Sequence, residues 1–191
     1  NRIDYYVHAE DSSALHNAAN GPNHWFYIKQ GPSQILIGNE NLVPTYTLYS
    51  PIYRFSSTST TSKSCSNIIY TSAELSSAGI NPGTTITSLA FDKNGIGGTN
   101  ANPLVFSIYM ANTSNVPPLS TATTWGNILA SHTLVYSQTA QQIPAVSGWV
   151  VFTLSTPFVY SGGSLEIATN AAFSGTQPWT TDKFEWKYSS G

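Results

Sequence analysis

Charge is scarce in this chain. Asp, Glu, Lys and Arg make up 8% of its 191 residues, and the formal net charge is -2, whereas a typical soluble domain is about one quarter charged. No Lys/Arg cluster is present, so counterion release gives no drive toward a phosphate backbone. Nucleic acid is therefore not an expected partner, and hydroxyl and amide side chains must cover most of the surface.

Cysteine and long apolar runs are also nearly missing. Cys65 is the one cysteine, so no internal disulfide can form, and an isolated, unreactive thiol in a Ser-rich strand or loop is expected. No apolar run approaches the roughly 18 residues that a membrane-spanning helix needs. Membrane insertion is not predicted.

Aromatic residues, at 13%, and hydrophobic residues, at 40%, are plentiful enough for a folded core. Short apolar segments recur between turn clusters, and in several of them the side chains alternate between two faces. In 105–110, for example, Val105, Ser107 and Tyr109 share one face, and Phe106, Ile108 and Met110 share the other. The pattern predicts an all-β fold, an antiparallel β-sandwich of jelly-roll type. The expected strands are 46–55, 67–70, 85–91, 105–110, 132–136, 149–154, 158–160, 164–169 and 184–188.

Two short helical turns are expected within the sandwich. Thr71 and Glu74 have capping-box spacing, Leu75 and Ala78 give an inner face, and Gly79 supplies a stop. A second helical turn is predicted over 124–131.

Residues 1–31 form a separate pattern. Two β-rich runs joined by a polar connection predict a hairpin, and Gly and Pro residues over 32–44 are typical of a linker. A hairpin alone cannot bury its face. We therefore expect residues 1–31 to close a preceding domain and residues 45–191 to form the β-sandwich, which makes the chain a fragment of a multidomain protein.

Metal-binding patterns are sparse. His8 and His16 flank Glu10 and Asp11, but they converge only if the loop folds back, and solvated loop histidines are the simpler interpretation.

A Ca²⁺ site could use oxygens of Asp92, Asn94 and Asn100, although a single carboxylate makes a poor site and a Gly-rich hairpin loop explains the same residues. No other cofactor is indicated.

Catalytic patterns are equally sparse. A glycosidase needs two carboxylates across a cleft, and Glu166, Glu185 and Asp92 are the candidates. Glu166 alternates with Leu165 and Ile167, which is typical of an outward strand residue. No catalytic residue is assigned.

Aromatic side chains in polar surroundings are the stronger ligand-binding candidates. Flat rings beside hydroxyls and amides suit the apolar faces and hydroxyl rims of sugars. The predicted ligand-binding residues are Trp125, Trp179, Trp186 and Tyr188. Trp149, between Gly148 and Val150, is instead expected in the core, on a strand that is apolar on both faces and therefore central.

Residues 45–191 contain an ordered series of characteristic segments, at 50–55, 69–75, 78–80, 82–89, 108–110, 123–125, 135–136, 148–154, 157–167 and 184–188. In this series the chain resembles an accessory module found in secreted and surface proteins of Bacteroidetes. The resemblance implies a non-catalytic β-sandwich, secreted or at the outer cell surface, strung between Ig-like or fibronectin-like domains and a C-terminal type IX secretion sorting domain. Residues 1–31 resemble the closing strands of an Ig-like domain, and the module's last strand is not present.

Three functions remain open at this point. The first is a binding or adhesion module that contacts polysaccharide or glycoprotein. The second is a structural or assembly domain, a surface fibre or spacer that self-associates through strand edges. The third is a jelly-roll hydrolase that uses Glu166, Glu185 or Asp92, and the parent protein could carry an enzyme elsewhere.

Overall fold

The computed structural model describes residues 34–37, 51–52, 63–94, 104–117, 124–173 and 185–186. The chain divides into two compact units, Asn1–Gln34 and Ile35–Gly191, and every strand and helix below lies in the second. The hairpin expected in residues 1–31 and most of the strand expected over 46–55 lie outside the described residues.

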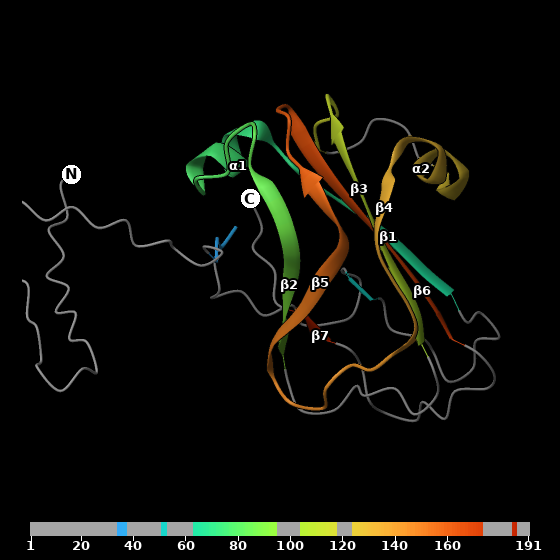
Figure 1. Cartoon of the computed structure of the whole chain (residues 1–191). Coiled ribbons are helices and arrows are strands. Elements are labelled where there is room, and N and C mark those ends of the chain that lie inside the picture. The colour runs from blue at the N-terminus through green and yellow to red at the C-terminus, as the bar shows by residue number, and fades with distance from the viewer. Residues whose placement is uncertain are drawn as a thin grey trace, which may run out of the picture. The chain divides into compact units, whose positions relative to one another are not determined.

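Two antiparallel sheets face each other in the second unit (Figure 1). The four-stranded sheet has the order β1 (Lys63–Tyr70), β6 (Ser164–Phe173), β3 (Leu104–Thr113) and β4 (Thr133–Gln141). The three-stranded sheet has the order β5 (Gly148–Val159), β2 (Thr85–Asn94) and β7 (Glu185–Trp186). The sequence prediction of an all-β, sandwich-like fold is confirmed.

The hydrophobic core lies between the sheets and follows the period of two along each strand. On β3, Phe106, Ile108 and Met110 point into the core, as the alternation predicts. On β5, every second residue from Val150 to Leu154 points inward. The ring centroids of Phe106 and Phe152 are 5.0 Å apart, which joins the two sheets directly. The inward residues of these two strands are Leu104, Phe106, Ile108, Met110, Val150, Phe152, Leu154 and Phe158.

Strand β5 is one continuous strand where the sequence predicts two. Its pairing with β2 shifts: Thr153 lies opposite Ser88, and Phe158 lies opposite Ile86. The stretch between them on β5 contains Pro157, which has no N–H to give to a ladder and is therefore confined to edges and irregularities. Within the same stretch, the Ser155 hydroxyl donates to the Val135 carbonyl of β4 at 3.0 Å, so the irregular part of β5 is tied to the other sheet.

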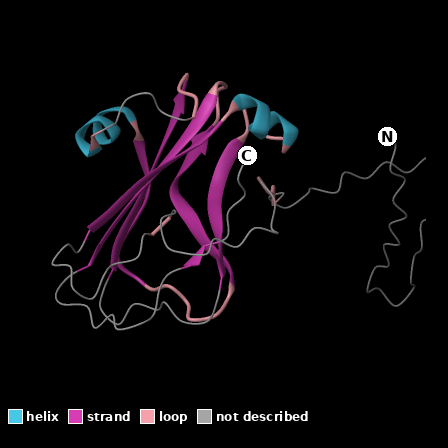
Figure 2. Ribbon diagram, turned by 180° about the vertical axis from the view of Figure 1, so that it is seen from behind, coloured by secondary structure: helices cyan, strands magenta, loops and turns pink. Residues whose placement is uncertain are grey.

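The two helices lie at the same end of the sandwich (Figure 2). Helix α1 (Ser72–Ser77) begins at the predicted capping box, in which Thr71 and Glu74 bond reciprocally, and Leu75 is its buried residue. Helix α2 (Trp125–Ser131) occupies the second predicted turn, with Thr124 as its N-cap. Both sequence predictions of helical turns are confirmed.

Candidate ligand-binding site

Trp186 is a core residue, which corrects its prediction as a ligand-contacting ring. It is 3% exposed, and its indole N–H donates to the Ile52 carbonyl at 3.2 Å. Strand β7 pairs with the end of β2, and this pairing places the indole edge-on to Phe91 at 6.3 Å. A ring enclosed in this way holds β7 to the core and cannot reach a ligand.

Trp125 is partly exposed and is the first residue of α2. Its ring lies edge-on to Tyr109 of β3 at 5.5 Å, and the Lys63 ammonium lies 5.9 Å from its centroid. Trp125 therefore keeps its place as a candidate contact. Trp179 and Tyr188 lie outside the described residues.

Trp149 is half exposed, at 50%, which corrects its prediction as a core residue. Val150 and Phe152 take the inward positions of β5, so Trp149 and Val151 must point outward. Strand β5 also lies at the edge of its three-stranded sheet, so it is not a central strand. The largest exposed ring among the described residues thus comes from a position that the sequence assigned to the core.

The proposed Ca²⁺ ligands do not form a described loop. Asp92 is buried near the end of β2, Asn94 is the last residue of that strand, and Asn100 lies outside the described residues. The hairpin-loop interpretation is therefore wrong for Asp92 and Asn94. Within the described part of the chain, no group of three or more His, Cys, Asp or Glu side chains converges on a metal site.

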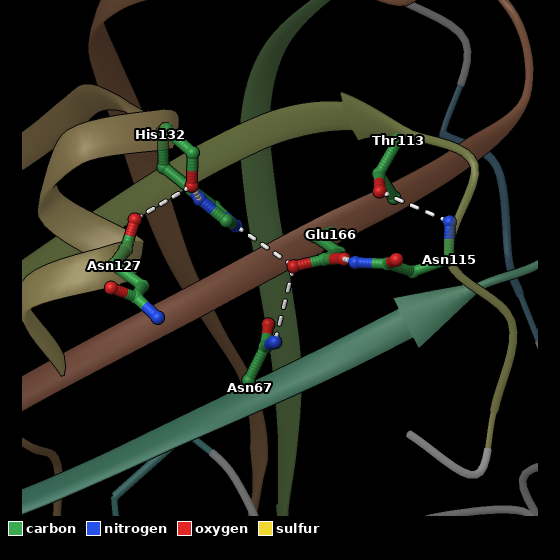
Figure 3. Close-up of polar contacts among 7 residues, drawn as sticks. Asn67, Thr113, Asn115, Asn127, His132 and Glu166 are labelled. Carbon is green, nitrogen blue, oxygen red and sulfur yellow. Dashed lines mark hydrogen bonds and ion pairs between the residues drawn. The ribbon is translucent and has the colours of Figure 1, made fainter. Parts of the chain in front are cut away.

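Glu166 faces outward from β6, as its alternation predicts, but it is buried, which corrects the expectation of an exposed side chain. Helix α2 and the segment after β3 cover this part of the four-stranded sheet (Figure 3). The amides of Asn115 and Asn67 donate to the two carboxylate oxygens at 2.6 and 3.2 Å. His132, at the C-cap of α2, approaches from the third side.

The contact between His132 and Glu166 is electrostatic. The ring Nε2 lies 3.1 Å from the Glu166 Oε2, and both side chains are 4% exposed. The ring N–H direction does not satisfy hydrogen-bond geometry toward that oxygen. The other ring nitrogen, Nδ1, lies 2.9 Å from the Ser131 hydroxyl, which in turn donates to the Asn127 carbonyl one helical turn earlier.

The carboxyl of Glu166 is held in its ionised form. Burial alone would raise its pKa, but hydrogen bonds from Asn115, Asn67 and Thr113 and the charge of His132 lower the pKa below its ordinary value. An ionised, fully contacted carboxylate is a poor general acid, and this one has little access to solvent. The cluster Asn67–Asn115–His132–Glu166, called here the Glu166 cluster, fastens α2 to the sheet.

Glu185 does not complete a catalytic pair with Glu166 in the described structure. It belongs to β7 of the three-stranded sheet, whereas Glu166 belongs to β6 of the other sheet, and the side chain of Glu185 lies outside the described residues. The fold is thus an antiparallel β-sandwich with described aromatic side chains on both outer faces: Trp149 on the three-stranded sheet, and Tyr109 with the neighbouring Trp125 of α2 on the four-stranded sheet.

Comparisons with protein-family models, curated proteins and solved structures found no match for this chain. The resemblance to the Bacteroidetes accessory module is therefore still a prediction. Neither described helix is long and apolar enough to cross a membrane.

Proposed function

We propose that the chain is a non-catalytic binding module of a larger secreted or cell-surface protein, and that it contacts polysaccharide or glycoprotein. The observation that supports this most is Trp149, a half-exposed indole on the outer face of the three-stranded sheet. Amphipathic rings at a wet surface are suited to ligands that have both apolar faces and hydroxyl rims.

The surroundings of Trp149 form a strip along β5, with one carboxylate, Asp92, opposite the indole on β2. Val151, at 58% exposure, and exposed Thr153 follow it on the same face of β5. Alternate residues on a strand lie about 7 Å apart, so this row spans about 13 Å. On β2, Asp92 faces Trp149 and is buried, whereas Ala90 and Ser88, which face Val151 and Thr153, are both exposed. An apolar strip with hydroxyls beside it suits a few linked sugar rings laid along β5.

Covering the indole would supply useful affinity. A tryptophan side chain offers about 150–250 Å² of surface, so a half-exposed ring leaves about 100 Å² to be covered. At about 25 cal/mol per Å², this area corresponds to about 2.5 kcal/mol, or nearly two orders of magnitude in affinity. One ring of this kind is enough to control retention on a polymer.

Retention on insoluble uncharged polysaccharides, together with an array of uncharged glycans, tests the proposal on the 191-residue chain. We expect Trp149→Ala to lose retention and Leu129→Ala, which removes a half-exposed apolar side chain from helix α2, to keep it. Because the other half of the ring is buried, circular dichroism must show that the Trp149→Ala variant is folded at the assay temperature. Wild-type protein that binds no glycan, or a Trp149→Ala variant that binds as tightly as wild type, would refute the proposal.

A structural or assembly role is the alternative that a specific observation supports. Strand β1 stands at one end of the order of the four-stranded sheet, and edge strands can pair with a second chain. Light scattering at high protein concentration separates the two functions, because a monodisperse monomer contradicts assembly. A hydrolase built on Glu166 is less well supported, since that carboxylate is buried and contacted on three sides.

A further inference from the structure

A second surface, on the four-stranded sheet, gathers a cation and two aromatic rings from three separate elements. Lys63 begins β1, Tyr109 lies on β3, and Trp125 begins α2. Strands β1 and β3 are the two neighbours of β6, so both side-chain rows border the same central strand. The Lys63 ammonium and the Tyr109 ring both contact the indole, at 5.9 and 5.5 Å.

The indole is held in place before any ligand arrives. Thr124 caps α2 at its start, and Ile128 of the same helix is buried. At the other end of α2, His132 reaches into the Glu166 cluster (Figure 3). Because the helix is fixed at both ends, binding at Trp125 costs little conformational entropy.

The ammonium remains available to an anion. Lys63 is exposed, and a cation above an aromatic ring keeps its charge and its N–H donors. The buried carboxylate of Glu166 does not compete for this cation, because it lies six residues along β6 from Ala172, the partner of Lys63, and is already contacted by two amides and a histidine. In a chain with only seven Lys and Arg residues, a lysine over an indole is a specific arrangement.

An amide lies beside this cation on the same face. Lys63 is opposite Ala172 on β6, and Cys65 is opposite Asn170, so Asn170 lies one pleat further along. The Asn170 carbonyl oxygen faces the Cys65 thiol at 3.4 Å. The NH₂ group of the Asn170 side chain is the hydrogen-bond donor that suits a ligand hydroxyl.

We propose that Lys63, Trp125 and Asn170 form a binding site for an acidic polysaccharide, with the sugar carboxylate on the ammonium and the sugar ring against the indole. A single cation beside an aromatic surface suits one carboxylate per sugar unit. Nucleic-acid binding would need many cations, and the chain carries a net charge of -2. The site is independent of Trp149, which lies on the other sheet, so a chain with both sites could bridge two polymers.

Isothermal titration with polygalacturonate tests the site, and fully methyl-esterified polygalacturonate is the matched ligand because it has the same backbone without the charge. We expect Lys63→Gln and Trp125→Ala each to weaken polygalacturonate binding by about tenfold or more. Lys63→Arg should retain binding, and Trp149→Ala should bind as wild type does. Raised salt should weaken wild-type binding and have little effect on Lys63→Gln.

Several results would overturn the inference. They are equal binding of the charged and esterified polymers, unchanged binding by Lys63→Gln, and equal or tighter binding of poly-glutamate, which would indicate an acidic peptide. Lys63 is exposed, so Lys63→Gln should fold normally, and circular dichroism checks Trp125→Ala. Because Trp149→Ala tests the other sheet, failure of this site and failure of the proposed function give different patterns.

Discussion

Replacing Glu166 by Gln should remove the ionic centre that fastens α2 to the four-stranded sheet. The variant keeps the shape and one acceptor for the Asn115 amide, but it places an NH₂ group where Asn67 now donates and His132 now lies. Hydrogen bonds to a charged group contribute about 1.5–3 kcal/mol each. Relief of the buried charge offsets part of this loss.

We expect a net loss of about 2–3 kcal/mol, which corresponds to about 5–10 °C in melting temperature for a domain of this size. Urea unfolding near neutral pH, followed by tryptophan fluorescence, measures it. Glu74→Gln is the matched control: Glu74 is the exposed acid of the α1 capping box, where Gln serves nearly as well, so its cost should be under about 0.5 kcal/mol.

The stability difference between wild type and Glu166→Gln should also depend on pH. The pKa of Glu166 is lowered in the folded chain, so the stability from its ionised form is fully present above the unfolded value of about 4.3. That stability is lost as the pH falls through the folded value. The difference between wild type and Glu166→Gln should therefore shrink in acid. A loss below 0.5 kcal/mol near neutral pH, or a loss equally large in strong acid, would refute this reasoning.

Three further predictions concern the framework around the two surfaces. Gly163→Ala should destabilise the fold by more than about 1 kcal/mol, because φ is +77° and a Cβ would lie 2.6 Å from the Thr113 carbonyl oxygen. Gly126→Ala, in α2, should stabilise the fold by about 0.5–1 kcal/mol, because the nearest atom to its Cβ would lie 3.8 Å away. Denaturant unfolding that shifts both variants in the same direction from wild type contradicts this. Trp186→Phe should cost about 1–3 kcal/mol, since it removes the N–H that bonds to a buried carbonyl, and an unchanged urea midpoint would count against that bond. Burial raises the pKa of Cys65, although a nearby lysine opposes this, so iodoacetamide should label Cys65 more slowly near neutral pH than it labels a free cysteine; equal rates would contradict it.

The helices and most strands could be predicted because their signals are local. The Thr71–Glu74 capping box and the stop at Gly79 lie within nine residues, and the bonds they imply are present. The alternation along β3 likewise separates core from surface without knowledge of its neighbours.

The exposure of Trp149 and of Trp186 was not predictable from their immediate neighbours. The run from Trp149 to Phe152 is apolar at every position, so it does not say which set points inward. The signal lay further along the strand, where polar Thr153 continues the outward series and Leu154 the inward one. Trp186 depended on pairing between β7 and β2, about ninety residues apart in sequence, which no local pattern contains.

The face of Glu166 was predicted and its burial was not. Alternation with Leu165 and Ile167 gives its direction correctly. Its cover comes from α2 and from Asn115, which are separate in sequence from β6 and from each other. Sequence periodicity specifies the side of a sheet, whereas burial also depends on what later packs against that side.

The irregular stretch of β5 also affects how the molecule resists aggregation. An incoming strand needs a regular row of N–H and C=O groups, and β5 interrupts that row at Pro157 and directs Ser155 onto β4. Edge-to-edge pairing with a second copy is therefore disfavoured along this stretch of β5, while the outward ring of Trp149 on the same strand remains exposed.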